Sequence, residues 1–257
     1  MNEGLTFLAT APAGFEPLLI AELSALGAND PKPVRGGVRF HGSLELAYRA
    51  CLWSRTASRV LLPLFEFPVT GTEALYAGIH DFPWETHLNP DSTLSVEFSG
   101  TCPGIDHVHF GAQRVKDAIV DRFRARFGRR PGVDRQRPDL QIHVLLRDGQ
   151  AIVSLDLASD SLHRRGYRAA TVIAPLKETL AAALLLKTDW PAIAAAGGVF
   201  LDPLCGSGTL AIEAAWIAGD HAPGLLRTHW GFSGWLGHVP ALWSRLLAEA
   251  TERCRAG

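Results

Sequence analysis

Residues 199–215, with the sequence VFLDPLCGSGTLAIEAA, decide the fold that this chain can adopt. The apolar run 199–201 predicts a buried parallel strand, and the residues from Thr209 onward predict a helix. Gly206 and Gly208 allow the backbone between them to turn sharply and to approach a ligand closely. The free N–H groups at the start of the helix would face the same ligand. The stretch therefore predicts a nucleotide-type cofactor site at the opening of a doubly wound sheet.

The glycine pattern Gly206-x-Gly208-x-x-Ala211 also fits the relaxed fingerprint of dinucleotide-binding enzymes. In that fold the strand runs directly into the first glycine, whereas here the segment from Asp202 to Cys205 intervenes. A carboxylate at the end of the strand is a poor neighbour for a pyrophosphate, but it can accept hydrogen bonds from the amine of S-adenosylmethionine. Two interpretations of Asp202 stay open: a contact to this cofactor, or a helix cap for the segment that follows.

The composition is typical of an ordinary globular protein with a proper core: 257 residues, 47% hydrophobic, 20% charged and a net charge of −1. This length favours two domains. The cysteines lack the spacing of a zinc site or a disulfide framework, which indicates a reducing, cytoplasmic location and no metal: Cys51, Cys102, Cys205 and Cys254. Since no apolar run approaches the ~18 residues that span a bilayer, we expect no membrane insertion.

Hydrophobic periodicity divides the chain into regions 1–65, 66–157, 158–175 and 176–257. In the first region we predict a helix over 14–26, a strand over 38–40, and a helix from an N-cap at Ser43 toward Val60, closed by Pro63.

In the second region, residues 72–79 and 111–127 have helical periodicity, and residues 93–98 predict a strand. Asp148-Gly149 separates two alternating runs, 140–146 and 151–157, which predicts a hairpin and an α+β domain ending near residue 157. Residues 158–175 are expected to form a linker, and 176–187 a helix before the glycine loop.

Two segments are rich in cations. Between His109 and Arg137 nine Lys or Arg residues stand against three Asp, and between Ser161 and Lys177 four stand against no acid. A solvated helix face and a plain linker would explain the two segments equally simply. In a nearly neutral chain they favour contact with the phosphates of RNA, through Arg114, Lys116, Arg122, Arg124, Arg129, Arg130, Arg164, Arg165, Arg168 and Lys177.

Seven motifs carry a resemblance to a known family: Gly36-Gly37-Val38-x-Phe40, Leu52-Trp53-Ser54-Arg55-x-Ala57-Ser58-Arg59, Val115-Lys116-Asp117-Ala118-Ile119-Val120-Asp121, Gly166-Tyr167-Arg168, Ala174-Pro175-Leu176-Lys177-Glu178-Thr179-Leu180-Ala181-Ala182, Asp202-Pro203-x-Cys205-Gly206-Ser207-Gly208-Thr209 and Trp230-Gly231-Phe232-Ser233-Gly234-Trp235. With these motifs the chain resembles the THUMP-domain bacterial 23S ribosomal RNA guanine-N2 methyltransferases, and specifically the N-terminal part of their bifunctional members.

The resemblance implies a fold class: an α+β N-terminal ferredoxin-like and THUMP region, followed by the truncated start of an α/β Rossmann-like methyltransferase domain. It implies S-adenosylmethionine as the cofactor and 23S ribosomal RNA of the large-subunit precursor as the partner. The cofactor residues that it implies are Thr179, Asp202, Pro203, Gly206, Ser207, Gly208 and Thr209.

The chain departs from the family pattern after the glycine loop. It has no second strand ending in an acidic residue, and no Pro-Pro pair that would belong to an Asn/Asp-Pro-Pro-Tyr/Phe motif for the target amine. We therefore assign no catalytic residue within it and expect RNA binding, weak or no cofactor binding, and no turnover by the chain alone. The alternatives are a stand-alone RNA-binding module, another THUMP-type tRNA-modifying enzyme and, least favoured, an NAD-dependent oxidoreductase.

Overall fold

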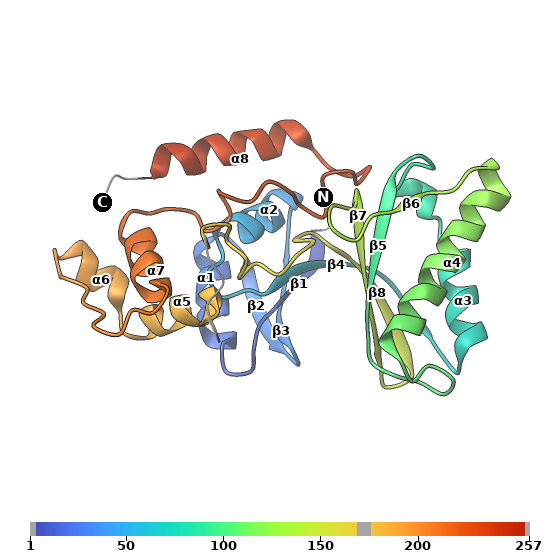
Figure 1. Cartoon of the computed structure of the whole chain (residues 1–257), viewed down its shortest axis with the longest axis horizontal. Helices are drawn as coiled ribbons and strands as arrows, with labels where there is room; N and C mark the ends of the chain where they lie inside the picture. The colour runs from blue at the N-terminus through green and yellow to red at the C-terminus, as the bar shows by residue number, and fades with distance from the viewer. Residues whose placement is uncertain (1–3, 169–175, 255–257) are drawn as a thin grey trace. The chain divides into compact units, whose positions relative to one another are not determined.

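The computed structural model describes residues 4–168 and 176–254, which form two compact units (Figure 1). The first unit comprises residues 1–60, 160–228 and 239–257, and the second comprises residues 61–159 and 229–238. The linker predicted over 158–175 lies partly outside the described residues. Among the helices described, none is both long enough and apolar enough to cross a membrane.

The first unit begins with three antiparallel strands in the order β2-β3-β1. Alternate residues of β1 are buried, and Phe7 stacks on Phe40 of β3 with 5.3 Å between ring centroids. Leu19 and Leu23, one helical turn apart, bury the inner face of α1. The elements here are β1 (Leu5–Thr10), α1 (Glu16–Ala25), β2 (Asn29–Val34), β3 (Gly37–Gly42) and α2 (Leu44–Trp53).

The predicted N-cap of α2 is confirmed, because the side chain of Ser43 accepts a hydrogen bond from the N–H of Leu46 at 3.3 Å. The predicted end of this helix near Val60 is wrong, because α2 ends at Trp53. Beyond it, the N–H of Arg55 donates to a carboxylate oxygen of Glu22 on α1 at 2.8 Å, which draws the backbone out of the helix.

Replacing Ser43 with Ala should lower the free energy of unfolding by about 1 kcal/mol, because an orphan N–H of the first turn loses its acceptor. Urea unfolding followed by tryptophan fluorescence measures the effect. The control is Ser24→Ala, at an exposed position in α1, where we expect no loss of stability. Equal losses in the two variants would contradict the capping role.

The second unit carries strands in the order β4-β8-β7-β5-β6, with antiparallel β4-β8 and β8-β7 pairs and parallel β7-β5 and β5-β6 pairs. Helices α3 and α4 lie side by side next to these strands (Figure 1). The elements are β4 (Arg59–Pro68), which begins in the first unit, α3 (Thr72–Asp81), a 3-10 turn (Trp84–Thr86), β5 (Thr93–Ser99), α4 (Val108–Phe127), β6 (Gly132–Val133), β7 (Leu140–Arg147) and β8 (Gln150–Asp156).

The hairpin predicted at Asp148-Gly149 is confirmed. Both residues have left-handed φ angles, 53° and 73°, and Arg147 pairs with Gln150 across a two-residue turn. The predicted closing role of Pro63 is wrong, because this proline lies within β4. It is tolerated there because the register with β8 shifts between Pro63 and Phe65, so the ladder is already irregular at that point.

The remaining helices of the first unit are α5 (Glu178–Lys187), α6 (Trp190–Ala195), α7 (Thr209–Ala218) and α8 (Pro240–Arg253). Helices α5 and α7 appear where the sequence predicts them, and α5, α6 and α7 share a small core of Leu185, Trp190 and Ala214. Helices α6 and α8 were not predicted.

The strand predicted over residues 199–201 is wrong for this structure. These residues have no strand hydrogen bonds, and Val199 and Leu201 are 90% and 83% exposed. Only Phe200 packs inward, edge-on to the ring of Trp190 at 5.3 Å. The physical reason is that a strand forms only beside another strand, and no strand within residues 176–254 can pair with this segment.

Candidate functional site

The glycine loop before α7 has the geometry that a ligand-binding turn requires. Gly206 and Gly208 both have left-handed φ angles, 54° and 74°, and the N–H of Gly208 donates to the carbonyl of Cys205 at 2.7 Å. No atom lies within 4 Å of the place where a Cβ of Gly206 would stand. The loop is therefore open on that side and is shaped by its backbone conformation rather than by packing.

Helix α7 starts immediately after this loop without a side-chain cap. Within the described residues, the N–H groups of Leu210 and Ala211 in its first turn have no hydrogen-bond acceptor. Such N–H groups, together with the helix dipole, favour an anionic group at this end of the helix.

Asp202 lies four residues before Gly206 and is partly exposed. Its Oδ1 accepts a hydrogen bond from the N–H of Leu204 at 3.1 Å, a local turn that shapes the loop. The interpretation of Asp202 as the cap of the following helix is wrong, because α7 has Gly208 at its N-cap. Its other carboxylate oxygen has no partner within residues 4–168 and 176–254, which leaves it available to a cationic group.

The start of α5 supplies the second side of the candidate site. Thr179 is buried in the first turn of α5, next to the buried Glu178, and α5 packs against α7. In the loop, Pro203 is exposed, and the hydroxyl groups of Ser207 and Thr209 lie 3.2 Å apart.

Arg168, predicted to bind RNA, instead points into this site. Its guanidinium donates to Glu178 at 2.8 and 3.1 Å, to the hydroxyl of Ser207 at 3.2 Å and to the hydroxyl of Thr209 at 3.4 Å. Four intramolecular acceptors, including the carbonyl of Leu176 at 3.2 Å, therefore hold one side chain.

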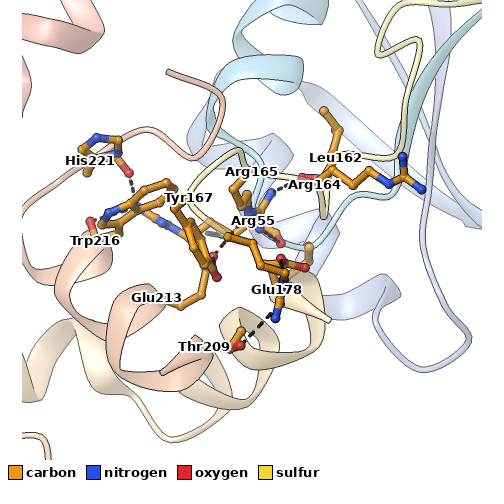
Figure 2. A network of polar contacts seen from close by, with 12 residues as sticks. Arg55, Leu162, Arg164, Arg165, Tyr167, Glu178, Thr209, Glu213, Trp216 and His221 are labelled. Carbon is orange, nitrogen blue, oxygen red and sulfur yellow. Dashed lines mark hydrogen bonds and ion pairs between the residues drawn. The ribbon is translucent and has the colours of Figure 1, made fainter. Parts of the chain in front are cut away.

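The prediction that Arg165 binds RNA is contradicted, because its side chain is only 2% exposed and lies in a buried polar network (Figure 2). It donates to the carbonyl groups of Arg55 at 2.7 Å and Leu162 at 2.8 Å, and it pairs with the fully buried Glu213 of α7 at 3.4 Å. Its donors are committed to the protein interior, so a polynucleotide cannot reach them.

The same network holds the second half of α7 and the residues that follow this helix. The hydroxyl of Tyr167 donates to Glu213 at 3.1 Å, and the guanidinium of Arg55 donates to the carbonyls of Trp216 and His221 at 3.2 and 2.8 Å (Figure 2). Burial raises the pKa of Glu213 and lowers the pKa of Arg55, because each charge has left water. This network was not predicted from the sequence, although a single carboxylate in the apolar helix 209–218 was a usable sign of a buried ion pair.

The other two cations of the second basic segment are on the surface. Arg164 is 2.8 Å from Asp160, and Lys177 is exposed at the N-cap of α5. An exposed pair such as that of Arg164 can open at little cost.

The basic residues on α4 mostly have acidic partners. Arg114 pairs with Glu73 at 2.8 Å and stacks over the ring of Tyr76, whereas Lys116 pairs with Asp117. The remaining ion pairs of this helix are Arg122–Glu85 at 2.8 Å, Arg126–Glu85 at 2.6 Å and Arg124–Asp121 at 3.0 Å. The charge run on the helix is therefore largely neutralised locally.

The Arg122–Glu85 pair is the firmest of these. Two parallel hydrogen bonds of 2.8 Å join the groups, and they lower the pKa of Glu85 to about 2. Arg122 also donates to the carbonyl groups of His80 and Asp81, at 2.9 and 3.2 Å. Its side chain is thus held by α3 and the 3-10 turn.

The positive charge of the loop after α4 is compensated by fewer acidic partners. Arg129 pairs with Asp91 on the surface at 2.8 Å. Arg130 and Arg135 are exposed, and neither forms an ion pair or hydrogen bond within the described ranges. The sequence indicated both the helix and this loop, and the uncompensated charge of this segment, within the described residues, lies in the loop.

No group of three or more His, Cys, Asp or Glu side chains within the described residues is arranged to hold a metal ion. The four cysteines are free thiols, of which Cys205 lies exposed in the glycine loop.

Three family models match the chain in succession. Residues 6–61 match the RlmL ferredoxin-like domain, residues 69–156 match the THUMP domain, and residues 165–256 match the RMKL-like methyltransferase domain. The ferredoxin-like and THUMP regions and the opening of a methyltransferase domain are thus confirmed.

Among named proteins, the chain is 53% identical over all of its 257 residues to the ribosomal RNA large subunit methyltransferase K/L of Stutzerimonas stutzeri, of which the match covers 35%. The chain thus spans about a third of the length of the curated relatives that it matches.

Two crystal structures are similar over nearly the whole chain. SMU.472, a methyltransferase candidate complexed with SAH, is 33% identical with a TM-score of 0.82, covering 99% of this chain and 66% of that one. A structure named as a predicted N6-adenine-specific DNA methylase from Listeria monocytogenes is 32% identical with a TM-score of 0.81, covering 98% and 65%.

Proposed function

Because the chain belongs to the family of the ribosomal RNA large subunit methyltransferases K/L, we propose that it provides the RNA-binding region and one wall of the cofactor site for methylation of 23S ribosomal RNA. The reaction is transfer of a methyl group from S-adenosylmethionine to the exocyclic N2 of a guanine. The observation that carries this proposal is the open glycine loop at the uncapped start of α7, with a carboxylate oxygen of Asp202 that has no partner among the described residues.

The residues present fit the amino-acid end of S-adenosylmethionine. The unpaired oxygen of Asp202 would accept from its ammonium group, and the first-turn N–H groups of α7 would donate to its carboxylate. The remaining contacts that we propose are with Thr179, Pro203, Gly206, Ser207, Gly208 and Thr209. When bound, the cofactor supplies an electrophilic methyl group on its sulfonium.

Guanine presents a weak nucleophile, since the lone pair of its exocyclic amine is delocalised. The target base must be unpaired or flipped, and its amine must be polarised and positioned. The chain has no Asn/Asp-Pro-Pro-Tyr/Phe motif for that task. We propose that residues 1–257 alone bind RNA, bind the cofactor weakly or not at all, and do not turn over.

We propose that the domains follow the boundaries 1–65, 66–157, 158–175 and 176–257, in line with the three family matches. Free thiols at all four cysteines suit the cytoplasm.

The RNA contacts that we retain are those on the surface: Arg129, Arg130, Arg164 and Lys177, joined by Arg135. Arg114, Lys116, Arg122 and Arg124 would have to exchange an acidic partner for phosphate.

Reversing the charge of Arg130 and Arg135 to Glu should weaken binding of protein-free 23S ribosomal RNA roughly 10-fold or more at low salt. The slope of log affinity against log salt concentration should flatten by about 1–2, because each lost phosphate contact removes about 0.7–0.9 from it. Filter binding across a salt series measures both quantities.

The matched control is the reversal of Arg35 and Arg39 to Glu, two exposed arginines of the first unit that form no ion pair among the residues described. If both double variants flatten the slope equally, the loop after α4 has no special part in RNA binding.

Methyl transfer tests the function itself. The protein from the complete open reading frame that contains this chain is incubated with labelled S-adenosylmethionine and, separately, with 23S ribosomal RNA, total tRNA and duplex DNA. We expect label only in 23S ribosomal RNA, at N2 of a guanine. Label in tRNA or DNA instead would overturn the substrate, and tight NADH binding without a response to S-adenosylmethionine would overturn the reaction.

A further inference from the structure

Arg168 connects the two elements that would hold the cofactor. Its guanidinium contacts Glu178, in the first turn of α5, and the hydroxyl groups of Ser207 and Thr209, at the glycine loop and the start of α7. The side chain of Arg168 is 23% exposed and that of Glu178 is 6% exposed. The contact set is thus largely shielded from water and spans the gap between the two elements.

A cation at the start of a helix is opposed by the helix dipole, so Arg168 would not be stable there by itself. The carboxylate of Glu178, 2.8 Å away, compensates it. With the pair nearly neutral, the guanidinium serves as a rigid fork of N–H donors rather than as a net charge.

The hydrogen bonds of the Ser207 and Thr209 hydroxyl groups indicate what the guanidinium of Arg168 does. Both oxygens accept from Arg168, and one hydroxyl donates to the other across 3.2 Å. Two hydroxyl groups carry two protons, so one O–H donor has no acceptor in the part of the chain that the structure describes. It lies at the same end of α7 as the N–H groups of Leu210 and Ala211, which lack acceptors among the described residues.

We propose that Arg168 is a positioning residue for the methyl donor: with Glu178 it fixes the glycine loop relative to α5 and orients the hydroxyls of Ser207 and Thr209. One hydroxyl proton is thereby directed at the carboxylate of the amino-acid tail. This inference rests on the proposed function, because it names a determinant of the same cofactor site.

The proposal separates two ligands that differ only in that tail. S-adenosylhomocysteine has the carboxylate, whereas 5′-methylthioadenosine lacks it and keeps the adenosine and the sulfur. In the protein from the complete open reading frame, Arg168→Gln should weaken S-adenosylhomocysteine about 10-fold, as expected for loss of one hydrogen bond to a charged group. Calorimetry should show unchanged affinity for 5′-methylthioadenosine. Steady-state kinetics should show a raised KM for S-adenosylmethionine, with kcat within about twofold of the wild-type value.

Arg168→Lys should restore only part of the affinity, because an ammonium cannot reach four acceptors with planar geometry. Arg245→Gln, which removes a surface arginine paired with Glu45, is the matched control and should change the affinity for neither ligand. Hydrogen exchange on the chain without ligand provides a separate readout: in Arg168→Gln, the amides of residues 205–212 should exchange about 10-fold faster, and those of β1 and β3 should be unchanged.

The outcomes are distinguishable. Wild-type protein that binds neither ligand refutes the proposed function, while hydrogen exchange still tests whether Arg168 holds the loop. If wild type binds both ligands and Arg168→Gln weakens both equally or neither, the positioning role is overturned. Unchanged exchange over residues 205–212 would overturn it as well.

Discussion

Replacing Glu213 with Gln should lower the free energy of unfolding by about 3–5 kcal/mol, the largest effect on stability that we expect in this chain. The substitution keeps the size of the side chain and an oxygen for the hydroxyl of Tyr167, but it removes the charge opposite Arg165. Arg165 is almost fully buried and Glu213 completely so, hence no water can take over the lost interaction.

Urea unfolding followed by tryptophan fluorescence measures the loss. The control is Glu249→Gln, which breaks the more exposed pair with Arg49 and should cost below about 1 kcal/mol. The double variant Arg165→Met with Glu213→Leu should recover much of the stability, because it removes both charges together. If Glu213→Gln and Glu249→Gln cost the same, the buried pair does not stabilise the unit as we infer.

Replacing Asp202 should have the largest effect on cofactor binding. In the protein from the complete open reading frame, Asp202→Asn should weaken S-adenosylhomocysteine about 10- to 100-fold, because the ammonium group loses an ionised acceptor. Asparagine keeps a side-chain oxygen for the N–H of Leu204, so the turn that shapes the loop should persist. Asp202→Ala removes both interactions and should bind more weakly still.

Calorimetry with S-adenosylhomocysteine and 5′-methylthioadenosine measures this effect, and only the first ligand should respond to Asp202→Asn. Asp160→Asn, which removes a surface carboxylate paired with Arg164, serves as the control. If Asp202→Asn binds S-adenosylhomocysteine with wild-type affinity, the carboxylate of Asp202 does not contact the cofactor as we propose.

The glycine loop and α7 could be predicted from the sequence because their signals are local. Glycines set the backbone angles, and an apolar run after them continues as a helix. The strand over residues 199–201 failed for the opposite reason. A strand depends on a neighbouring strand, whereas the apolar side chains of Val199 and Leu201 show only that these residues would favour burial.

The basic residues show what a charge run conceals. Arg164, Arg165 and Arg168 are close in sequence, yet one is on the surface, one is buried against Glu213, and one faces the glycine loop. The acidic partner of Arg165 is 48 positions away, so spacing could not reveal the burial. The early end of α2 has a similar origin, because Glu22 on another helix captures the backbone of Arg55.

The compact unit that holds the glycine loop is built from three separate stretches of chain, with its N-terminal strands and its last helix in the same body. Arg55, from the stretch that matches the ferredoxin-like family, binds carbonyl groups just beyond the middle of the stretch that matches the methyltransferase family. Recombination between homologous genes at the borders of the three matched domains would therefore separate residues that bind one another. The front and back stretches should be inherited as a pair, and the THUMP segment is tied to the back stretch as well, because residues 229–238 belong to its compact unit.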